Sequence, residues 1–424
     1  MNFGKNKAVT LGTTEKKVIL KCSTADILAR PGPVSIIEFI KVCIEEAYQL
    51  RASDVHIDPT ETDVKIRLRI DGVLHDRCSF SKTILSEVIS RIKVLSNLRT
   101  DEHQAAQDGR FRMTTPDSTN IDVRVSITPT YYGENAVLRL LADHSSQFTL
   151  GMLGFSDADQ EKIIHAISQP HGMILATGPT GSGKTTTLYT IIKILNKKEV
   201  SLITIEDPIE YAIPGITQIQ INHHSNLTFA AGLRSILRQD PNIIMVGEIR
   251  DAETASIATN TALTGHLLLS TLHTNDSATT LPRLLDMGID AYLVASTVNV
   301  AIGQRLVRKI CENCKESHTL TEAEKKNLLR TLPHRLKQTD FGDTFYRGDG
   351  CKKCDQTGFK GRIGIYEVLE VSPAVREAIL NRASSIVIRD IAISEGMTTM
   401  FEDGLLKAAS GQTSLAEVLR TINE

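Results

Sequence analysis

The sequence has no long hydrophobic run and no excess of one sign of charge. A membrane-spanning helix needs roughly 20 consecutive apolar residues, and no stretch of this chain reaches that length. Residues 1–22 are polar and lack the apolar centre of a secretory signal peptide. The chain has 48 lysine and arginine residues and 50 aspartate and glutamate residues. This balance does not predict electrostatic binding of the whole protein to nucleic acid. These absences predict a cytoplasmic protein with no direct membrane insertion.

Cysteine is also scarce, with seven residues in a chain of 424. Four of them form two Cys-x-x-Cys pairs, Cys311 with Cys314 and Cys351 with Cys354. In a reducing compartment this pattern indicates a metal site rather than disulfides. Four thiolates complete a tetrahedral Zn²⁺ site with no open position, which predicts a structural metal. A redox pair or four unrelated thiols stay open as alternatives, because the pairs are further apart than in a simple zinc ribbon.

The length of the chain exceeds what one hydrophobic core serves, so two domains and a smaller module are expected. Residues 1–32 are polar without periodicity and are predicted to form a flexible leader. An α+β domain is predicted over 33–141, and the unpatterned stretch within 142–150 indicates a linker. The nucleotide-binding domain is predicted over 151–424, including the cysteine module at 306–362 and a helical C-terminal tail.

Two patterns carry the α+β prediction. Ser35 and Glu38 form an S-x-x-E capping box, and apolar residues at helical spacing follow: Ile36, Ile37, Ile40, Ile44 and Ala47. Residues 64–70 and 121–127 alternate between apolar and polar as strands do. On the second of these strands Arg124 falls on the face opposite the apolar residues, so it is expected to point away from its own domain's core.

The strongest signal is a complete G-x-x-x-x-G-K-[ST] loop at 178–185, between an apolar run at 173–176 and a helical pattern at 186–195. Its glycines let backbone N–H groups face the phosphates, Lys184 adds a positive charge, and the Thr185 hydroxyl can ligate Mg²⁺. The start of the helix favours an anion as well. The motif predicts binding of ATP and Mg²⁺ by these residues: Gly178, Pro179, Thr180, Gly181, Ser182, Gly183, Lys184, Thr185 and Thr186.

Acidic residues follow two further apolar runs, at 202–205 and 243–246. Ligands of parallel sheets bind at the carboxyl ends of the strands, so these acids are expected to converge on the phosphate loop. There they can hold Mg²⁺ or polarise the water that attacks the γ-phosphate. The candidates are Glu206, Asp207 and Glu210 after the first run and Glu248 after the second.

A further apolar run at 267–271 leads to His273. A lone histidine is more often a hydrogen-bonded structural residue than a catalytic one. At the end of a strand beside the γ-phosphate, however, a neutral imidazole could sense the phosphate and relay its loss. The sequence therefore predicts His273 as a candidate sensor.

These motifs, in their order, resemble the secretion-superfamily ATPases that power type II secretion and type IV pilus assembly. The resemblance runs from about residue 33 to the end of the chain. It rests on the phosphate loop followed by Thr-Thr-Leu-Tyr, an aspartate box at 205–211, the run 238–251 around Val-Gly-Glu-Ile-Arg-Asp, and a histidine box at 264–275. It implies a RecA-like P-loop NTPase core, an N-terminal α+β (PAS-like) domain, a tetracysteine zinc insert and a helical C-terminal tail.

The resemblance also implies roles for matching residues. Glu248 resembles the Walker B acid, Glu210 the water-activating acid of the aspartate box, and His273 the γ-phosphate sensor. Family members work as hexameric rings in which one subunit's small N-terminal domain closes over its neighbour's nucleotide. Arg124 and Arg139 resemble the pair that acts in trans on that nucleotide. The strand pattern supports Arg139 less cleanly, because it shares its strand face with apolar residues.

The implied function is a cytoplasmic hexameric ATPase that turns ATP hydrolysis into mechanical work for pilus assembly or protein secretion. The implied partners are an inner-membrane platform protein and a cytoplasmic-membrane docking protein. Assembly-type members often carry a further N-terminal docking domain, so with only residues 1–32 ahead of the first expected helix another docking surface or a different contact is expected.

Three alternatives remain. One is a nucleotide-regulated structural ring that binds ATP without useful turnover, but intact candidate acids and arginines favour the motor. The second is a nucleic-acid translocase, which the near-neutral composition and the mixed charges of the cysteine module argue against. The third is a pilus-retraction ATPase, which generally lacks the tetracysteine insert.

Overall fold

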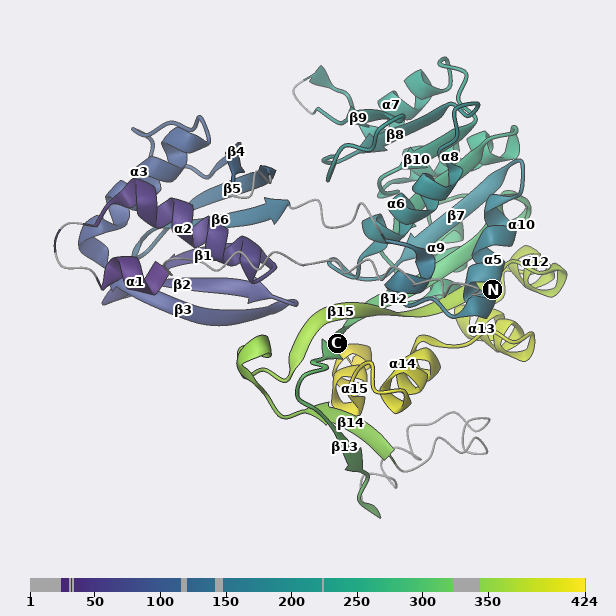
Figure 1. The fold of residues 1–424 in the computed structure, drawn as a ribbon. Coiled ribbons are helices and arrows are strands. Elements are labelled where there is room, and N and C mark those ends of the chain that lie inside the picture. The colour runs from purple at the N-terminus through teal and green to yellow at the C-terminus, as the bar shows by residue number, and fades with distance from the viewer. Residues whose placement is uncertain are drawn as a thin grey trace, which may run out of the picture. The chain divides into compact units, whose positions relative to one another are not determined.

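The computed structural model describes residues 24–29, 32, 34–115, 120–141, 148–222, 225–322 and 344–423. The chain divides into two compact units, residues 1–143 and 144–424 (Figure 1). The unpatterned part of the predicted linker, 142–147, lies outside the described residues. Among the residues described, no helix is both long enough and apolar enough to cross a bilayer.

Unit 1 is an antiparallel sheet with helices packed on one face (Figure 1). The strand order is β3-β2-β1-β6-β5-β4. The predicted strands at 64–70 and 121–127 both form, and the Asp71-Gly72 hairpin turn has positive φ at both residues. The elements are α2 (Ile36–Gln49), β1 (Ala52–Pro59), β2 (Asp63–Ile70), β3 (Val73–Ser81), α3 (Leu85–Leu95), β4 (Gln107–Thr114), β5 (Asn120–Thr130) and β6 (Gly133–Leu141).

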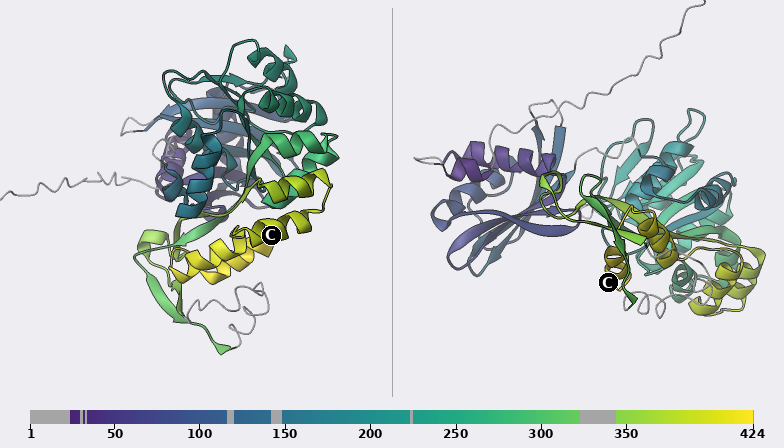
Figure 2. Two further views of the ribbon diagram at one scale, coloured as in Figure 1. Left: turned by 90° about the vertical axis from the view of Figure 1, so that its right-hand side faces the viewer. Right: turned by 60° about the horizontal axis from the view of Figure 1, so that its bottom comes forward.

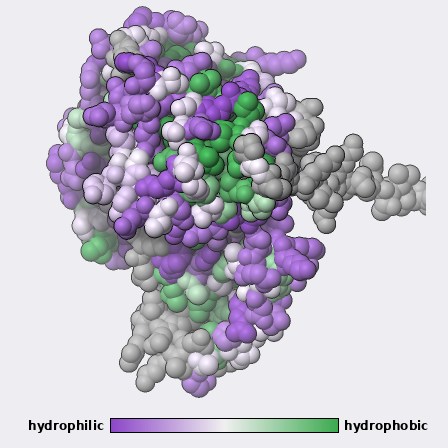
Figure 3. Space-filling model, turned by 90° about the vertical axis from the view of Figure 1, so that its left-hand side faces the viewer, coloured by the Kyte–Doolittle hydropathy of each residue, from purple (hydrophilic) through white to green (hydrophobic). Residues whose placement is uncertain are grey.

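Two expectations for this unit need correction. Residues 24–28 of the predicted flexible leader form a short helix, α1 (Thr24–Leu28), because the Thr24 backbone N–H donates to the buried Glu46 carboxylate at 2.9 Å. Ser35 caps α2 as expected, accepting from the Glu38 N–H. Ile37, however, is 62% exposed, because it lies at the margin of the apolar stripe of α2. On the face of the molecule shown in Figure 3, hydrophobic residues form one large patch and a few smaller ones among hydrophilic residues.

Unit 2 is built on a seven-stranded sheet of order β15-β12-β7-β11-β10-β8-β9. The six strands from β12 to β9 run parallel, and β15 joins the edge antiparallel to β12. Strands β7, β8, β10 and β11 are buried along their whole length, as parallel strands covered on both faces must be. Their bounds are β7 (Gly172–Thr177), β8 (Leu202–Glu206), β9 (Thr217–Gln220), β10 (Ile243–Val246), β11 (Leu267–Leu272), β12 (Val298–Ile310) and β15 (Phe359–Glu370).

Helices cover both faces of this sheet and form a separate core on each. One core involves α4 (Leu150–Leu153), α5 (Asp157–Ile167) and α6 (Lys184–Leu195). The opposite core involves α7 (Phe229–Ile236), α8 (Ala252–Leu263), α9 (Ser277–Asp286), α10 (Ala291–Thr297), α12 (Pro373–Leu380) and α13 (Ser385–Ser394). Because these strands run parallel, their carboxyl ends all lie at the same end of the sheet, which is where such sheets bind ligands.

The predicted helical tail is present, and its helices follow one another along unit 2 (yellow in Figure 2). Its last two helices, α14 (Met400–Ala409) and α15 (Leu415–Asn423), share a small core with the hairpin β13 (Lys315–Thr319) and β14 (Thr344–Gly348). This hairpin lies between the two cysteine pairs in the chain. The cysteine module is therefore packed against the C-terminal tail.

Candidate functional site

The phosphate loop connects β7 to α6 in the strand, loop and helix order that the motif requires. Gly178, Gly181 and Gly183 have φ values of 143°, 81° and 89°, a region that disfavours other residues. At Gly178 a Cβ would also lie 2.4 Å from the backbone oxygen of Gln304. Gly183 is the N-cap of α6, so the helix begins at Lys184 and not at the expected residue 186. The start of this helix faces the loop and adds N–H groups to the anion site.

Lys184 is buried at the base of the loop. Its ammonium donates to the Gly178 carbonyl at 2.7 Å and the Pro179 carbonyl at 3.0 Å. Burial lowers the pKa of Lys184, and the negative charge of Glu248 opposes that shift. The acid predicted as Walker B residue thus acts electrostatically on the phosphate-loop lysine.

Glu248 and His273 come together at the edge of the sheet. One carboxylate oxygen of Glu248 lies 3.2 Å from His273 Nε2, and the other lies 2.6 Å from an Arg250 guanidinium nitrogen. The hydrogen bond from Arg250 to Glu248 raises the pKa of Arg250. The contact arises because β10 and β11 are parallel neighbours, which places the residues after their carboxyl ends side by side. Sequence reasoning placed both residues here, and it missed Arg250 as the partner of Glu248.

The three acids of the aspartate box occupy different environments. Glu206 is buried and accepts hydrogen bonds from the Tyr189 hydroxyl and, at 2.5 Å, from the Thr204 hydroxyl. Burial, together with the charge of Glu206, raises the pKa of Tyr189. Asp207 is exposed and Glu210 is half-buried. Glu206 therefore joins α6 to β8 inside the core, whereas Asp207 and Glu210 are the acids of the box that remain accessible.

The two candidate arginines of unit 1 are neighbours across its sheet. Arg124 on β5 pairs in register with Arg139 on β6, and Arg110 on β4 pairs with Arg124 from the other side. The Arg139 side chain is 62% exposed, and its Nε donates to the buried Asp54 carboxylate at 2.9 Å. Sequence reasoning missed Arg110 and Asp54. Strand alternation in 107–114 was the signal that could have revealed Arg110, whereas no local pattern connects Asp54 with a residue 85 positions away.

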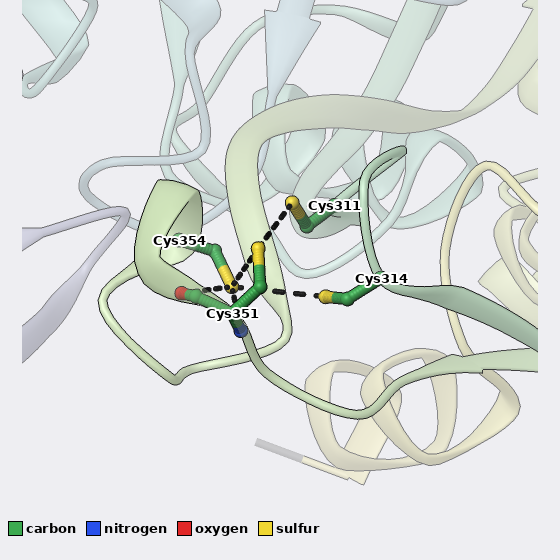
Figure 4. Close-up of side chains that lie close together, drawn as sticks. All are labelled: Cys311, Cys314, Cys351 and Cys354. Atoms are coloured by element: carbon green, nitrogen blue, oxygen red, sulfur yellow. Dashed lines mark hydrogen bonds between the residues drawn. The ribbon is translucent and has the colours of Figure 1, made fainter.

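The four paired cysteines converge in unit 2 (Figure 4). Cys311 follows the end of β12 directly, and Cys351 and Cys354 lie just before β15, which pairs with β12. That pairing brings the two halves of the motif together across a long stretch of chain. All four sulfurs lie within 4.8 Å of one another.

The spacing of these sulfurs fits a tetrahedral zinc ion. Four sulfurs at the usual Zn–S distance of about 2.3 Å would be separated by about 3.8 Å along each tetrahedron edge. The measured separations are 3.8 Å for Cys311 to Cys351, 3.8 Å for Cys314 to Cys354 and 3.7 Å for Cys351 to Cys354. An S–S bond is only about 2.05 Å long, so none of these pairs is a disulfide. The donor set suits a structural zinc ion.

Comparison with known proteins identifies the family of this fold and site. The family model described as "Type II/IV secretion system protein" matches residues 31–420. The type IV pilus assembly ATPase PilB of Thermus thermophilus is 45% identical over 92% of this chain. PilB of Pseudomonas aeruginosa is 41% identical over 95% of this chain. Type II secretion system protein E of Xanthomonas campestris is 45% identical over 95% of this chain. The chain spans 44% of the length of the Thermus relative and 70% of each of the other two.

Solved structures agree on the fold. The Legionella pneumophila ATPase DotB superposes with a TM-score of 0.67 at 24% identity, covering 93% of this chain and 97% of DotB. The pilus retraction motor PilT, solved with bound ADP, superposes with a TM-score of 0.60 at 25% identity, covering 90% of this chain and 96% of PilT. These likenesses extend over both units of the chain.

Proposed function

Since this chain belongs to the type II/IV secretion system protein family, we propose that it hydrolyses ATP and converts the energy into mechanical work for pilus assembly or protein secretion. The observation that carries this proposal is the contact between Glu248 and His273 at the carboxyl ends of β10 and β11, beside β7, whose carboxyl end leads into the phosphate loop. Relatives that are 41–45% identical and named as pilus assembly ATPases or type II secretion proteins support the choice of process.

Each group of the site has a place in this proposal. The loop's backbone N–H groups and Lys184 bind the β- and γ-phosphates, and the phosphates replace the two carbonyls to which Lys184 now donates. The Thr185 hydroxyl and Glu248 are the groups that would hold Mg²⁺, which neutralises charge on the transferring phosphoryl group. Glu210 polarises the attacking water. His273 relays loss of the γ-phosphate through its contact with Glu248.

Assembly completes the proposed site. In a homo-hexamer, Arg124 and Arg139 would stabilise the transition state on a neighbouring subunit's ATP, a contribution of about 10³- to 10⁵-fold in other nucleotidases. Asp54 holds Arg139 by a direct hydrogen bond, so its guanidinium is positioned before any partner arrives. The work would be delivered through an inner-membrane platform protein. The domains proposed for these tasks are residues 33–141 and 151–424.

We further propose that the four cysteines bind a structural Zn²⁺. The closed tetrahedral set leaves no position for a reacting water, so the ion would hold the module at 306–362 together without entering the hydrolysis. A tetracysteine module supports assembly or secretion rather than retraction.

ATP turnover as a function of protein concentration tests the proposed function. Light scattering would give the mass at each concentration, with Glu248→Gln as the inactive control. We expect turnover to rise cooperatively as hexamers form and to fall about a hundredfold or more in the variant. Binding without turnover in every assembly state, including with the platform protein added, would instead support a structural ring.

A further inference from the structure

Gln304 on β12 makes a contact with the phosphate loop that no motif predicts. Its side chain is 1% exposed, and its amide nitrogen donates to the backbone carbonyl of Ser182 at 2.6 Å. The backbone oxygen of Gln304 lies so close to Gly178 that a Cβ there would approach within 2.4 Å. One residue of β12 therefore touches the loop near its beginning and near its end.

The bond to Ser182 fixes the orientation of one peptide group. In a planar trans peptide the carbonyl and the N–H point in opposite directions. Because Gln304 holds the Ser182 carbonyl toward β12, the N–H of Gly183 must point away from β12 and into the loop. Glycine tolerates both signs of φ, so without this restraint the Ser182–Gly183 peptide could flip at little steric cost. A flipped peptide would present a carbonyl oxygen to the phosphates in place of a donor.

Two unsatisfied polar atoms argue that this contact is not there for stability alone. Within the part of the chain that the structure describes, Gln304 Oε1 and Ser182 Oγ are buried without a hydrogen-bond partner. Such atoms are rare in folded proteins because leaving them unpaired destabilises the fold. An apolar side chain of the same length would fill the space at position 304 and remove the unpaired Oε1. What the apolar side chain would lack is the donor to Ser182.

We infer that Gln304 is a positioning residue of the nucleotide site, which orients the Gly183 N–H toward the phosphates. This inference rests on the proposed function only in requiring that the loop binds a nucleotide. It assigns part of the phosphate affinity to a residue 122 positions from Ser182 in the chain. In this role Gln304 acts through the Ser182–Gly183 peptide and not through a contact of its own with the nucleotide.

The test compares Gln304→Met, which keeps the length of the side chain but has no donor, with the wild type. We expect the Kd for Mg-ADP, measured by isothermal titration calorimetry, to rise about tenfold, as the loss of one oriented phosphate contact implies. The unfolding temperature without ligand should change little, because loss of the unpaired Oε1 offsets loss of the donor to Ser182. A merely structural role would lower it. Gln304→Glu, which removes the donor and adds a negative charge, should bind more weakly still.

Arg305→Met is the matched control, because Arg305 is the next residue of β12 and donates to the Thr421 carbonyl of α15 instead of to the loop, at 2.7 Å. Its Kd for Mg-ADP should equal that of the wild type. Equal affinity in Gln304→Met and wild type would overturn the inference, and so would equal weakening in both variants. If Gln304→Met does not fold, Gln304→Glu carries the same comparison. Failure of the wild type to bind Mg-ADP would instead refute the proposed function.

Discussion

Glu248 links the charged groups of the site, since its two carboxylate oxygens contact different partners, Arg250 and His273. Glu248→Gln keeps the shape and removes the negative charge, so the loop should still bind nucleotide. We expect turnover to fall about a hundredfold or more, as when one transition-state contact is removed elsewhere. Steady-state ATPase assays and equilibrium nucleotide binding measure the two effects. Turnover at the wild-type rate would refute the Walker B assignment.

The matched control for that experiment is Glu253→Gln. Glu253 pairs with Arg234 at 2.6 Å on an exposed surface, so it tests loss of an ion pair near the same strand without touching the site. Exposed ion pairs contribute little to stability, and turnover should stay at the wild-type level.

Lys184→Ala should strongly weaken nucleotide binding. The Lys184 ammonium donates to two carbonyls of the loop, and the phosphates would take the place of these carbonyls. We expect the affinity for Mg-ATP to fall about a hundredfold or more, because charge-assisted contacts to phosphate are among the strongest hydrogen bonds. Equilibrium binding of a fluorescent ATP analogue measures the loss. Lys197→Ala, at an exposed position after the same helix, is the control, and binding by Lys184→Ala equal to that control would contradict the prediction.

At this scale the sequence was informative where a residue belongs to a motif at a strand end. The convergence of Glu248 and His273 was predictable because parallel strands end together. The burial of Glu206 under Tyr189 was not, because it depends on how α6 packs across β8. Gln304 could not be found from sequence, since its contact with Ser182 joins two distant segments.

At the scale of elements, α15 is attached to β12 through one carboxylate. Glu417 accepts hydrogen bonds from Arg308 on β12 at 2.5 Å and 2.9 Å and from Arg420 at 3.0 Å. Burial alone would raise the pKa of Glu417, but the two arginines outweigh it and hold the pKa at about 2, against a usual 4.5. Because the folded-state pKa is the lower one, the resulting stability is present above pH 4.5 and is lost as the pH falls toward 2.

We therefore predict that Glu417→Gln lowers the free energy of unfolding of unit 2 by about 3 kcal/mol at neutral pH. The difference from wild type should shrink as the pH falls from 4.5 toward 2. Urea unfolding followed at several pH values measures it, with Glu377→Gln at an exposed position of α12 as control. A difference that stays constant over this pH range would show that the ion pairs are not its cause.

The cysteine module offers a second test at this scale. Cys351→Ser should release the proposed zinc and expose the amides of β13 and β14, because these strands lie between the two cysteine pairs that the ion would hold together. Elemental analysis measures the metal, and hydrogen exchange measures the amides. Cys78→Ser, which alters a cysteine of unit 1 outside the cluster, should change neither. Absence of zinc from the wild type purified without chelator would remove the metal assignment.

The elements themselves were largely predictable from periodicity, and the misses have local causes. The helix α1 has only five residues, too few to show a period, and its order depends on Glu46 from another element. The start of α6 moved to Lys184 because Gly183 adopts a positive φ that ends the loop. The phosphate-loop motif gives the residues of the loop but not the φ of Gly183, so it does not show where the helix begins.

At the scale of the whole molecule, the proposed hexamer predicts complementation between inactive subunits. Arg124→Ala and Arg139→Ala should each lack ATPase activity, because each removes a cation from the same row of the unit 1 sheet. Arg124→Ala subunits keep Glu248 and Glu248→Gln subunits keep both arginines, so rings mixed from these two contain interfaces with a complete site, and mixing them should restore part of the activity. Mixing Arg124→Ala with Arg139→Ala should restore none, because both arginines of an interface come from one subunit. ATPase assays on mixtures measure this, with mixed hexamers verified by native mass spectrometry. Verified mixed rings without recovery would contradict action in trans.

The strand β12 has a consequence for how force can travel through this chain. Its thirteen residues run from beside β7 to Ile310, where the cysteine cluster begins. Gln304 and Cys311 are seven residues apart on this backbone, roughly 23 Å of extended chain. Over this span β12 is hydrogen-bonded to β15 along its length. A pull on the cysteine cluster would therefore pass along the backbone of β12 to Gln304, and from Gln304 through one hydrogen bond to the Ser182 carbonyl. In the proposed motor, mechanical load on the cysteine module would then change the affinity of the phosphate loop for the nucleotide.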